Sequence, residues 1–306
     1  MGFSLANVGG RAALVKGEHY YDLESLSDGV LASDPMVALG SIEKLHEMSA
    51  ALADASPTGK LNDAQLEAPV PRPAQCFGIG LNYRNHAAES NMPIPGVPLT
   101  FTKFPSSISG PNADVQMRSD FVDYEGELVV VIGKAGKDIA LENALDHVAG
   151  LCVGQDFSDR AVQFASQPPQ FSLGKSFETF SPIGPYVVSL DELPEDFALR
   201  LTTVVNGEGR QNDSTGDLIF DIPGLVSYLS NILPLQVGDV IFTGTPGGVG
   251  MAKMKFLEDG DMVTTAIEGL GALHNRCVRA SDHPNADKIP AFFEKAKEKE
   301  KEKEKE

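Results

Sequence analysis

The sequence lacks the cysteine patterns of disulfide-rich and zinc-binding domains. Its only three cysteines, Cys76, Cys152 and Cys277, stand far apart and form no CxxC pair. This argues against a disulfide framework and a zinc knuckle, and it favours a reducing, cytoplasmic compartment. Since no run of about 18 apolar residues occurs, we expect no membrane span. The N-terminus also lacks the basic and apolar regions of a secretory signal.

Basic residues are in short supply. The 25 Lys and Arg residues face 43 Asp and Glu residues, which gives a formal net charge of −18 at pH 7. The C-terminal run EKAKEKEKEKEKE contributes nothing to this charge, because its Lys and Glu alternate. An acidic body argues against a nucleic-acid partner, which needs a basic face. It is compatible with a cation site, although most acidic residues are expected on ordinary solvated surface.

The chain divides into three predicted parts. Residues 1–70 read as a small N-terminal α+β unit, with two short strands around a Lys16-Gly17 turn and helical spacing of apolar residues over 42–52. The Pro-rich segment 68–75 is a linker, and residues 71–280 form the main body. The low-complexity tail, residues 281–306, is expected to be disordered or a solvated helix.

The main body is rich in short apolar segments that are typical of strands. Asn206-Gly207 is a hairpin-turn signal behind one of them. Helical spacing occurs at 141–150, where Gly150 would end the helix, and at 222–233. Because helices do not alternate regularly with strands, the pattern excludes a doubly wound α/β sheet and predicts a strand-dominated α+β fold.

The stretch DYEGELVVVIG, residues 123–133, contains the first candidate site. On a strand, Glu125 and Glu127 point to the same side, which continues as Val129 and Val131. The pair is either a solvated strand end or two ligands of a cation, because two buried carboxylates repel each other without one. Carboxylates with no nearby His or Cys favour a hard ion, namely Mg²⁺ with Mn²⁺ or Ca²⁺ as alternatives.

Two further residues extend this candidate site. Asp156 follows the apolar residues 151–153 and is therefore placed at a strand end, where it is the best candidate for a third ligand. Lys175 stands among small and apolar residues in SLGKSFETF. It is either an ordinary surface lysine or a cation that balances an anionic site or holds a substrate carboxylate.

A candidate general base lies earlier in the chain, in GLNYRNHAAES. His86 and Glu89 are three residues apart and share one face of a helical turn. They are either a surface pair or an imidazole whose basicity a carboxylate raises. The Pro-rich MPIPGVP that follows is typical of a segment that closes over a site. The Gly-rich FTGTPGGVG lacks the Lys of a Walker A loop, and we expect it to present the Thr245 hydroxyl.

Taken in order, the segments GIGLNYRNHAAE, VDYEGELVVVIG, CVGQDFSDRAVQ, GKSFETFSPIGPYVV, VNGEGRQ and GDVIFTGTPGGVG resemble the fumarylacetoacetate hydrolase family over about residues 76–280. The resemblance implies a mixed β-roll and usually a homodimer. It implies a Mg²⁺ or Mn²⁺ ion on carboxylates matching Glu125, Glu127 and Asp156. Gln155 departs from the Asn of many relatives, and we expect no loss of metal from it.

The resemblance also implies roles for individual side chains. His86 and Glu89 match a pair that activates water, Lys175 matches a lysine that contacts substrate, and Gln163 matches a glutamine that positions the water or the oxyanion. Substrate contacts are implied for four further residues, Tyr83, Arg84, Thr215 and Thr245.

The expected function follows from these assignments. We expect a hydrolase that cleaves a C–C bond of a 2,4-dioxo acid and has a small-molecule substrate, with no nucleic-acid or membrane partner. The same platform also supports 2-oxo acid decarboxylation, as of oxaloacetate, or an isomerase or lyase reaction of aromatic or sugar-acid catabolism. A third alternative is a non-catalytic protein that uses the carboxylates as a structural Ca²⁺ site.

Overall fold

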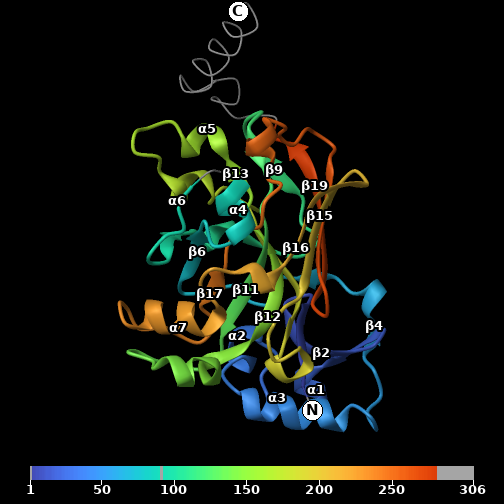
Figure 1. The fold of residues 1–306 in the computed structure, drawn as a ribbon. Helices are drawn as coiled ribbons and strands as arrows, with labels where there is room; N and C mark the ends of the chain where they lie inside the picture. The colour runs from blue at the N-terminus through green and yellow to red at the C-terminus, as the bar shows by residue number, and fades with distance from the viewer. Residues whose placement is uncertain (1, 90–91, 281–306) are drawn as a thin grey trace, which may run out of the picture.

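The computed structural model describes residues 2–89 and 92–280, and its main feature is a twelve-stranded mixed sheet (Figure 1). The order of its main path is β4-β3-β2-β1-β14-β12-β11-β17-β6-β7, with β5 beside β1 and β8 beside β14. The strands of this sheet are β1 (Ser4–Val8), β2 (Arg11–Lys16), β3 (His19–Asp22), β4 (Gly59–Lys60), β5 (Leu66–Glu67), β6 (Cys76–Gly80), β7 (Leu99–Thr102), β8 (Ile108–Ser109), β11 (Gly126–Ile132), β12 (Val148–Gln155), β14 (Ser181–Val188) and β17 (Val240–Phe242).

A second sheet has five strands in the order β16-β15-β18-β19-β9, and a short ribbon pairs β10 with β13. Their bounds are β9 (Val115–Met117), β10 (Val122–Asp123), β13 (Ser158–Asp159), β15 (Arg200–Val205), β16 (Glu208–Ser214), β18 (Met262–Ile267) and β19 (Gly271–Arg279). The pairs β6–β17, β8–β14 and β9–β19 are parallel, whereas the other paired strands are antiparallel.

The helices are short. The α-helices are α1 (Leu23–Leu26), α2 (Pro35–Ala38), α3 (Ile42–Ala51), α4 (Arg84–Glu89), α5 (Arg160–Gln163), α6 (Phe171–Gly174) and α7 (Ile222–Ser230). The 3₁₀ helices are η1 (Leu61–Asp63), η2 (Pro105–Ser107), η3 (Leu141–His147), η4 (Leu190–Glu192), η5 (Thr215–Asp217) and η6 (Gly250–Lys253). The strand-dominated α+β prediction is therefore confirmed. No helix in this part of the chain has the length and apolar composition needed to span a bilayer.

The N-terminal unit has the predicted elements. Strands β2 and β3 form the hairpin around Lys16-Gly17, and α3 begins at Ile42 as the apolar spacing indicated. Residues 68–75 contain no helix or strand, which fits a linker. However, β1 pairs with β14, so the N-terminal strands continue the large sheet of the main body. The boundary near residue 70 stays a prediction, and the prediction for the tail at 281–306 lies outside the described residues.

Strand β11 is buried on both faces, which explains its unbroken apolar sequence. Val129 and Val131 pack in one core with the N-terminal unit, including Leu5 and Leu14. The alternate residues of β11, Leu128, Val130 and Ile132, pack in a second core that includes residues of α7 such as Leu225. A strand with two dry faces is a rigid support for the acidic residues at its start.

One predicted helix is wrong. Residues 141–147 form only the 3₁₀ helix η3, and Val148 already begins β12. Gly150 is therefore a strand residue rather than a helix end, and a Cβ there would lie 2.2 Å from the carbonyl oxygen of Val188. Pairing of β12 with both β11 and β14 overrides the local helical spacing. The other predictions in this region are confirmed, since Asn206-Gly207 joins β15 to β16 and α7 falls within 222–233.

Candidate active site

The three predicted carboxylates lie together where β11 begins and β12 ends. Glu125 directly precedes β11, Glu127 is within it, and Asp156 directly follows β12. Antiparallel pairing aligns Gly126 with Gln155, which brings the strand ends side by side. Oxygens of Glu125, Glu127 and Asp156 all lie within 4.8 Å of one another, and all three residues are buried. The interpretation of Glu125 and Glu127 as a solvated strand end is therefore wrong.

The negative charges of the carboxylates are balanced by nearby cations to different degrees. Burial opposes ionisation of Glu125, but Lys175 and Arg160 outweigh it and lower its pKa to about 2. Burial, Asp156 and Glu125 together raise the pKa of Glu127 well above its usual value. Within the described residues, Glu127 forms no ion pair within 4 Å, and its hydrogen-bond donor is the Gly244 amide at 2.7 Å.

The cluster fits a hard divalent cation. Three carboxylates on rigid strand ends are the oxygen ligands that Mg²⁺ and Mn²⁺ prefer, and Glu127 lacks a paired charge. The cluster therefore has the chemistry of a metal site, and the identity of the ion belongs to the proposal below.

Lys175 lies at the cluster, as predicted. Its Nζ donates to Glu125 Oε2 at 2.7 Å, to Asp156 Oδ2 at 2.7 Å and to the Ser158 hydroxyl at 2.8 Å. Burial alone would lower the pKa of Lys175, but Asp156 and Glu125 raise it, so the ammonium stays charged. Three bonds use all three of its donors. The alternative of an ordinary surface lysine is wrong.

A second buried lysine, Lys103, was not predicted from the sequence. Lys103 follows β7 and is 0% exposed, and its Nζ donates to Asp156 Oδ1 and to the Lys175 carbonyl oxygen. The available signal was its setting in FTKFP, where a phenylalanine stands within two residues on each side. A charged residue inside such an apolar run is buried only when it is paired.

The pairing of Arg160 with Asp123 was not predicted. The Arg160 guanidinium donates twice to Asp123 Oδ2, at 2.7 and 2.9 Å. It also donates to Glu125 Oε1 at 2.6 Å and to Gln163 Oε1 at 2.8 Å. Asp123 in turn accepts from the amides of Gly250 and Met251, at 2.7 and 2.8 Å. Arg160 therefore orients Gln163 beside Glu125, and Asp123 fixes the start of η6.

His86 and Glu89 lie on α4, as predicted. His86 Nδ1 is 3.7 Å from Glu89 Oε2, which is longer than a hydrogen bond, and it is buried without a hydrogen-bond partner among the described residues. Glu89 Oε2 also accepts from the Gly248 amide at 3.0 Å. A small shift of either side chain would form a hydrogen bond between them. Hydrogen bonds of catalytic pairs are often long in ligand-free structures and shorten when substrate binds.

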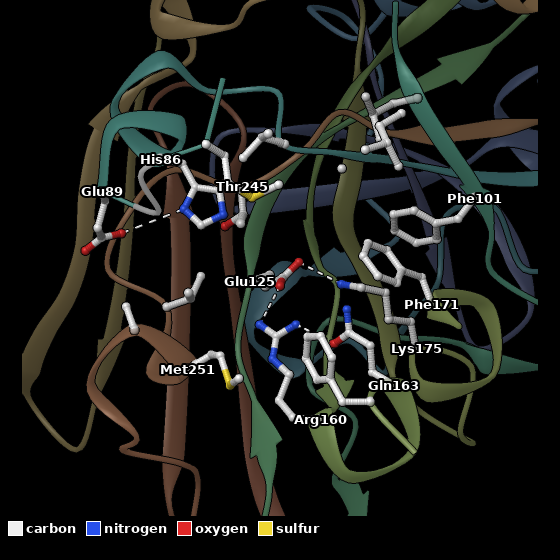
Figure 2. Close-up of a pocket in the computed structure, with 18 residues that line it drawn as sticks. His86, Glu89, Phe101, Glu125, Arg160, Gln163, Phe171, Lys175, Thr245 and Met251 are labelled. Carbon is white, nitrogen blue, oxygen red and sulfur yellow. Dashed lines mark hydrogen bonds and ion pairs between the residues drawn. The ribbon is translucent and has the colours of Figure 1, made fainter. Parts of the chain in front are cut away.

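One cavity of about 330 Å³ joins these groups. His86, Glu89, Glu125, Arg160, Gln163, Lys175 and Thr245 all line it. Figure 2 shows the His86 ring and the Glu125 carboxylate facing the same space, with Lys175 and Gln163 beyond Glu125. The rest of the wall is mostly apolar. A candidate base, a charged cluster and a cavity therefore coincide, which is typical of an active site.

The four predicted substrate contacts have different outcomes. Thr245 lines the cavity, and its hydroxyl donates to the Gly126 carbonyl at 2.9 Å. Tyr83, Arg84 and Thr215 do not line it. The Arg84 guanidinium instead donates to the carbonyls of Asp217 and Leu218, at 3.0 and 2.6 Å. The Thr215 hydroxyl forms hydrogen bonds with the Phe197 carbonyl and the Leu199 amide. Arg84 thus anchors α4 to η5 rather than facing the cavity.

Known proteins share this architecture. Residues 75–278 match the family described as Fumarylacetoacetate (FAA) hydrolase C-terminal. The chain is 43% identical over 230 residues to the fumarylacetoacetate hydrolase domain-containing protein 2 homolog of Dictyostelium discoideum, covering 70% of this chain and 74% of that protein. It is 40% identical over 232 residues to the mitochondrial oxaloacetate tautomerase FAHD2A of Bos taurus, covering 74% of each.

Solved structures agree. A putative HpcE protein from Mycobacterium smegmatis superposes with a TM-score of 0.85 at 43% identity, covering 91% of this chain and all of that one. Maleylpyruvate hydrolase from Sphingobium sp. SYK-6, in complex with manganese(II) and pyruvate, superposes with a TM-score of 0.76 at 28% identity, again over 91% of this chain and all of that one.

Proposed function

The chain belongs to the fumarylacetoacetate hydrolase family, whose members are enzymes, and on that premise we propose that it is a Mg²⁺- or Mn²⁺-dependent hydrolase of 2,4-dioxo acids. The observation that carries the proposal is the position of the His86–Glu89 pair, which lines the same cavity as Glu125 and Lys175. A base beside a cation-binding cluster is what water-dependent cleavage next to an enolate requires.

The charges of the cluster support an anionic substrate. Four buried carboxylates, those of Asp123, Glu125, Glu127 and Asp156, face three buried cations, Lys103, Arg160 and Lys175, so formally one negative charge remains. A bound divalent cation would change this balance to one positive charge. Such a site attracts the carboxylate of a 2-oxo acid.

Glu125, Glu127 and Asp156 would hold the ion, which when bound supplies a Lewis acid that stabilises an enolate oxygen. A hydrogen bond from His86 Nδ1 to Glu89, formed after a small shift of either side chain, would leave Nε2 to remove a proton from water. The hydroxide adds to the C4 carbonyl of the substrate, and the C3–C4 bond breaks. His86 then returns the proton to C3 of the departing enolate, so the products are a carboxylic acid and a 2-oxo acid.

A second candidate function is keto–enol tautomerisation of oxaloacetate. It is favoured by the 40% identity to the bovine protein named oxaloacetate tautomerase. In that reaction His86 would move a proton between C3 and the enol oxygen, and no water would be consumed.

Product analysis in H₂¹⁸O separates the candidates. The Mg²⁺- or Mn²⁺-loaded protein is incubated with acylpyruvates and, separately, with the enol form of oxaloacetate. Hydrolysis places one ¹⁸O in the carboxylic acid derived from the acyl group. Decay of the enol absorbance without new products identifies a tautomerase, and CO₂ release identifies a decarboxylase. A cation-induced rise in melting temperature with no turnover of any substrate would support a structural site instead.

A further inference from the structure

Outside the charged cluster, the wall of the cavity is apolar on two sides. Its members include three aromatic residues and three aliphatic or sulfur-containing ones: Phe101, Phe164, Phe171, Leu99, Val249 and Met251. Figure 2 shows Phe101 and Phe171 on the Lys175 side of the cavity, and Met251 on the opposite side, near Arg160. The 2-oxo acid end belongs at the cluster, so this wall faces the other end of the substrate.

The aromatic part of the wall is built in a defined position. The rings of Phe101 and Phe171 meet edge to face, with centroids 5.7 Å apart, and Lys175 Nζ lies 5.2 Å from the Phe101 centroid. Gly78 of β6 makes room for the Phe101 ring, because a Cβ at that position would lie 2.3 Å from it. The wall is therefore a packed surface rather than a loose loop.

Among the described residues, every lysine or arginine that lines the cavity is already paired with acidic groups of the cluster. Arg160 and Lys175 are the only lysine or arginine residues, among those the structure describes, that line the cavity. The three donors of Lys175 are used by Glu125, Asp156 and Ser158. Arg160 is held by Asp123, Glu125 and Gln163. Glu89 adds a negative charge at the edge of the same cavity.

We propose that the substrate of this enzyme carries an uncharged alkyl or aryl acyl group, so that it is a monoanionic 2,4-dioxo acid rather than a dicarboxylate. A second carboxylate at the far end would be desolvated against Phe101, Phe171 and Met251 with no counter-charge, and Glu89 would repel it. A hydrocarbon group there buries apolar surface instead. This inference rests on the proposed function for the 2-oxo acid end alone.

Binding and turnover of matched probes test the inference. The probes are 4-phenyl-2,4-dioxobutanoate and 2,4-dioxooctanoate as monoanions, and fumarylpyruvate and maleylpyruvate as dianions. Dissociation constants for the Mg²⁺-loaded protein come from calorimetry at short times, and kcat/KM is measured separately. We expect the monoanions to be preferred at least about tenfold in both quantities. Equal or tighter binding of the dianions would overturn the inference while leaving hydrolysis intact.

The two proposals fail in different ways. If the monoanions bind more tightly but none is cleaved, the hydrolase assignment fails and the specificity stands. If no probe binds, both are wrong.

A charge introduced into the wall gives a second test. In Met251→Lys, the lysine side chain is nearly as long as the methionine it replaces and supplies a positive charge in the wall. We expect this variant to reduce the preference for monoanions at least about tenfold. The matched control is Met254→Lys, because Met254 is 42% exposed and does not line the cavity. An unchanged preference in a folded, Mg²⁺-binding Met251→Lys protein would show that this wall does not contact the acyl group.

Discussion

The backbone amide nitrogen of Asp156 lies 2.9 Å from the carbonyl oxygen of Glu125. This bond ties together the two strand ends that carry the candidate metal ligands. Two buried glutamines complete the arrangement, since Gln155 Oε1 accepts from the Glu125 amide and Gln211 Oε1 from the Gly126 amide, each at 2.9 Å. The positions of the carboxylates are therefore set by a bonded backbone, before any cation binds.

Gln155→Met should test this support. The variant keeps the side-chain length but leaves the Glu125 amide and the Thr265 hydroxyl, which Gln155 Nε2 now reaches at 2.7 Å, without this partner. An unsatisfied buried group costs roughly 1–3 kcal/mol, and we expect that loss in urea denaturation. Because Glu125 is then less well oriented, we also expect Mn²⁺ affinity to fall about tenfold in calorimetry.

The control for this prediction is Asn275→Leu. Asn275 is also a buried amide, and its Nδ2 donates to the carbonyls of Pro111 and Ala113 rather than to the cluster. It should lower stability without changing Mn²⁺ affinity. Equal Mn²⁺ affinities for Gln155→Met and wild type would show that Gln155 is only structural.

Cation binding should strengthen as pH rises. The raised pKa of Glu127 means that its carboxyl group stays protonated to a higher pH than an ordinary glutamate, and a binding cation competes with this proton. The Glu127 carboxyl group therefore binds its proton more tightly in the folded state than in the unfolded state, where its pKa is about 4.5. As the pH rises above 4.5, this difference lowers the stability of the cation-free protein. Glu127→Gln should therefore raise the melting temperature of the cation-free protein at pH 7 and abolish the increase that Mg²⁺ or Mn²⁺ produces in wild type.

Thermal denaturation with EDTA and with excess Mn²⁺, between pH 5 and 8, measures both effects. Glu195→Gln removes the charge of an exposed glutamate and should change neither. A cation-induced increase in the melting temperature of Glu127→Gln equal to that of wild type would exclude Glu127 as a ligand.

Loss of the imidazole should separate catalysis from cation binding. His86→Ala removes the proposed base, so we expect hydrolysis to fall by roughly 10²–10⁴-fold. Mn²⁺ affinity should stay unchanged, because His86 donates nothing to the three carboxylates. His147→Ala is a suitable control, since His147 Nδ1 contacts the Lys134 carbonyl outside the cavity. Wild-type rates in His86→Ala would rule out the assignment of the base.

The sequence allowed prediction of the features that depend on local pattern. The two-residue spacing of Glu125 and Glu127 and the strand end before Asp156 suggested a carboxylate cluster but left a solvated strand end open. Asn206-Gly207 was sufficient to predict a hairpin. The resemblance to the family favoured the functional interpretation where the residues alone left alternatives open, as they did for Lys175 and for the His86–Glu89 pair. Features that depend on distant pairing were missed. Strand β12 overrode a helical pattern because both of its edges are paired.

Buried charges were the hardest features to predict. Lys103 meets Asp156 across 53 positions in the sequence, and Arg160 meets Asp123 across 37. No local spacing shows that such residues are partners, because each one alone resembles a surface charge. The same limit affects Arg84 and Thr215, whose backbone partners lie at η5 and at residues 197–199.

Removal of the buried Lys103 charge should show how strongly the cluster depends on its cations. Lys103→Met leaves Asp156 with one lysine fewer in a site that is 0% exposed. Breaking a buried pair in this way costs about 3–5 kcal/mol, and saturating Mg²⁺ should restore part of the loss because it binds the same carboxylate. Urea denaturation with and without Mg²⁺ gives both values, with the exposed Lys134→Met as the control. A loss below about 1 kcal/mol would contradict the role of Lys103.

The N-terminal unit provides a test of pH-dependent stability away from the cavity. A hydrogen-bonded Arg11 and the Ser25 amide lower the pKa of Asp22 from 3.8 to about 2, against the opposing effect of burial. A lowered pKa contributes stability that is fully present above pH 3.8 and is lost as the pH falls toward 2. Asp22 is also the N-cap of α1, where asparagine is an equally good cap.

Asp22→Asn therefore removes the charge and keeps the cap. Because Arg11 is 47% exposed and solvent screens the pair, we expect a loss of only about 1 kcal/mol at pH 7. The difference between variant and wild type should shrink below pH 3.8 and vanish near pH 2, as followed by urea denaturation at each pH. Glu18→Gln, which changes an exposed residue of the same hairpin, should show no such dependence. A loss that stays constant from pH 7 to 2 would mean that packing or capping, not the ion pair, accounts for the contribution of Asp22.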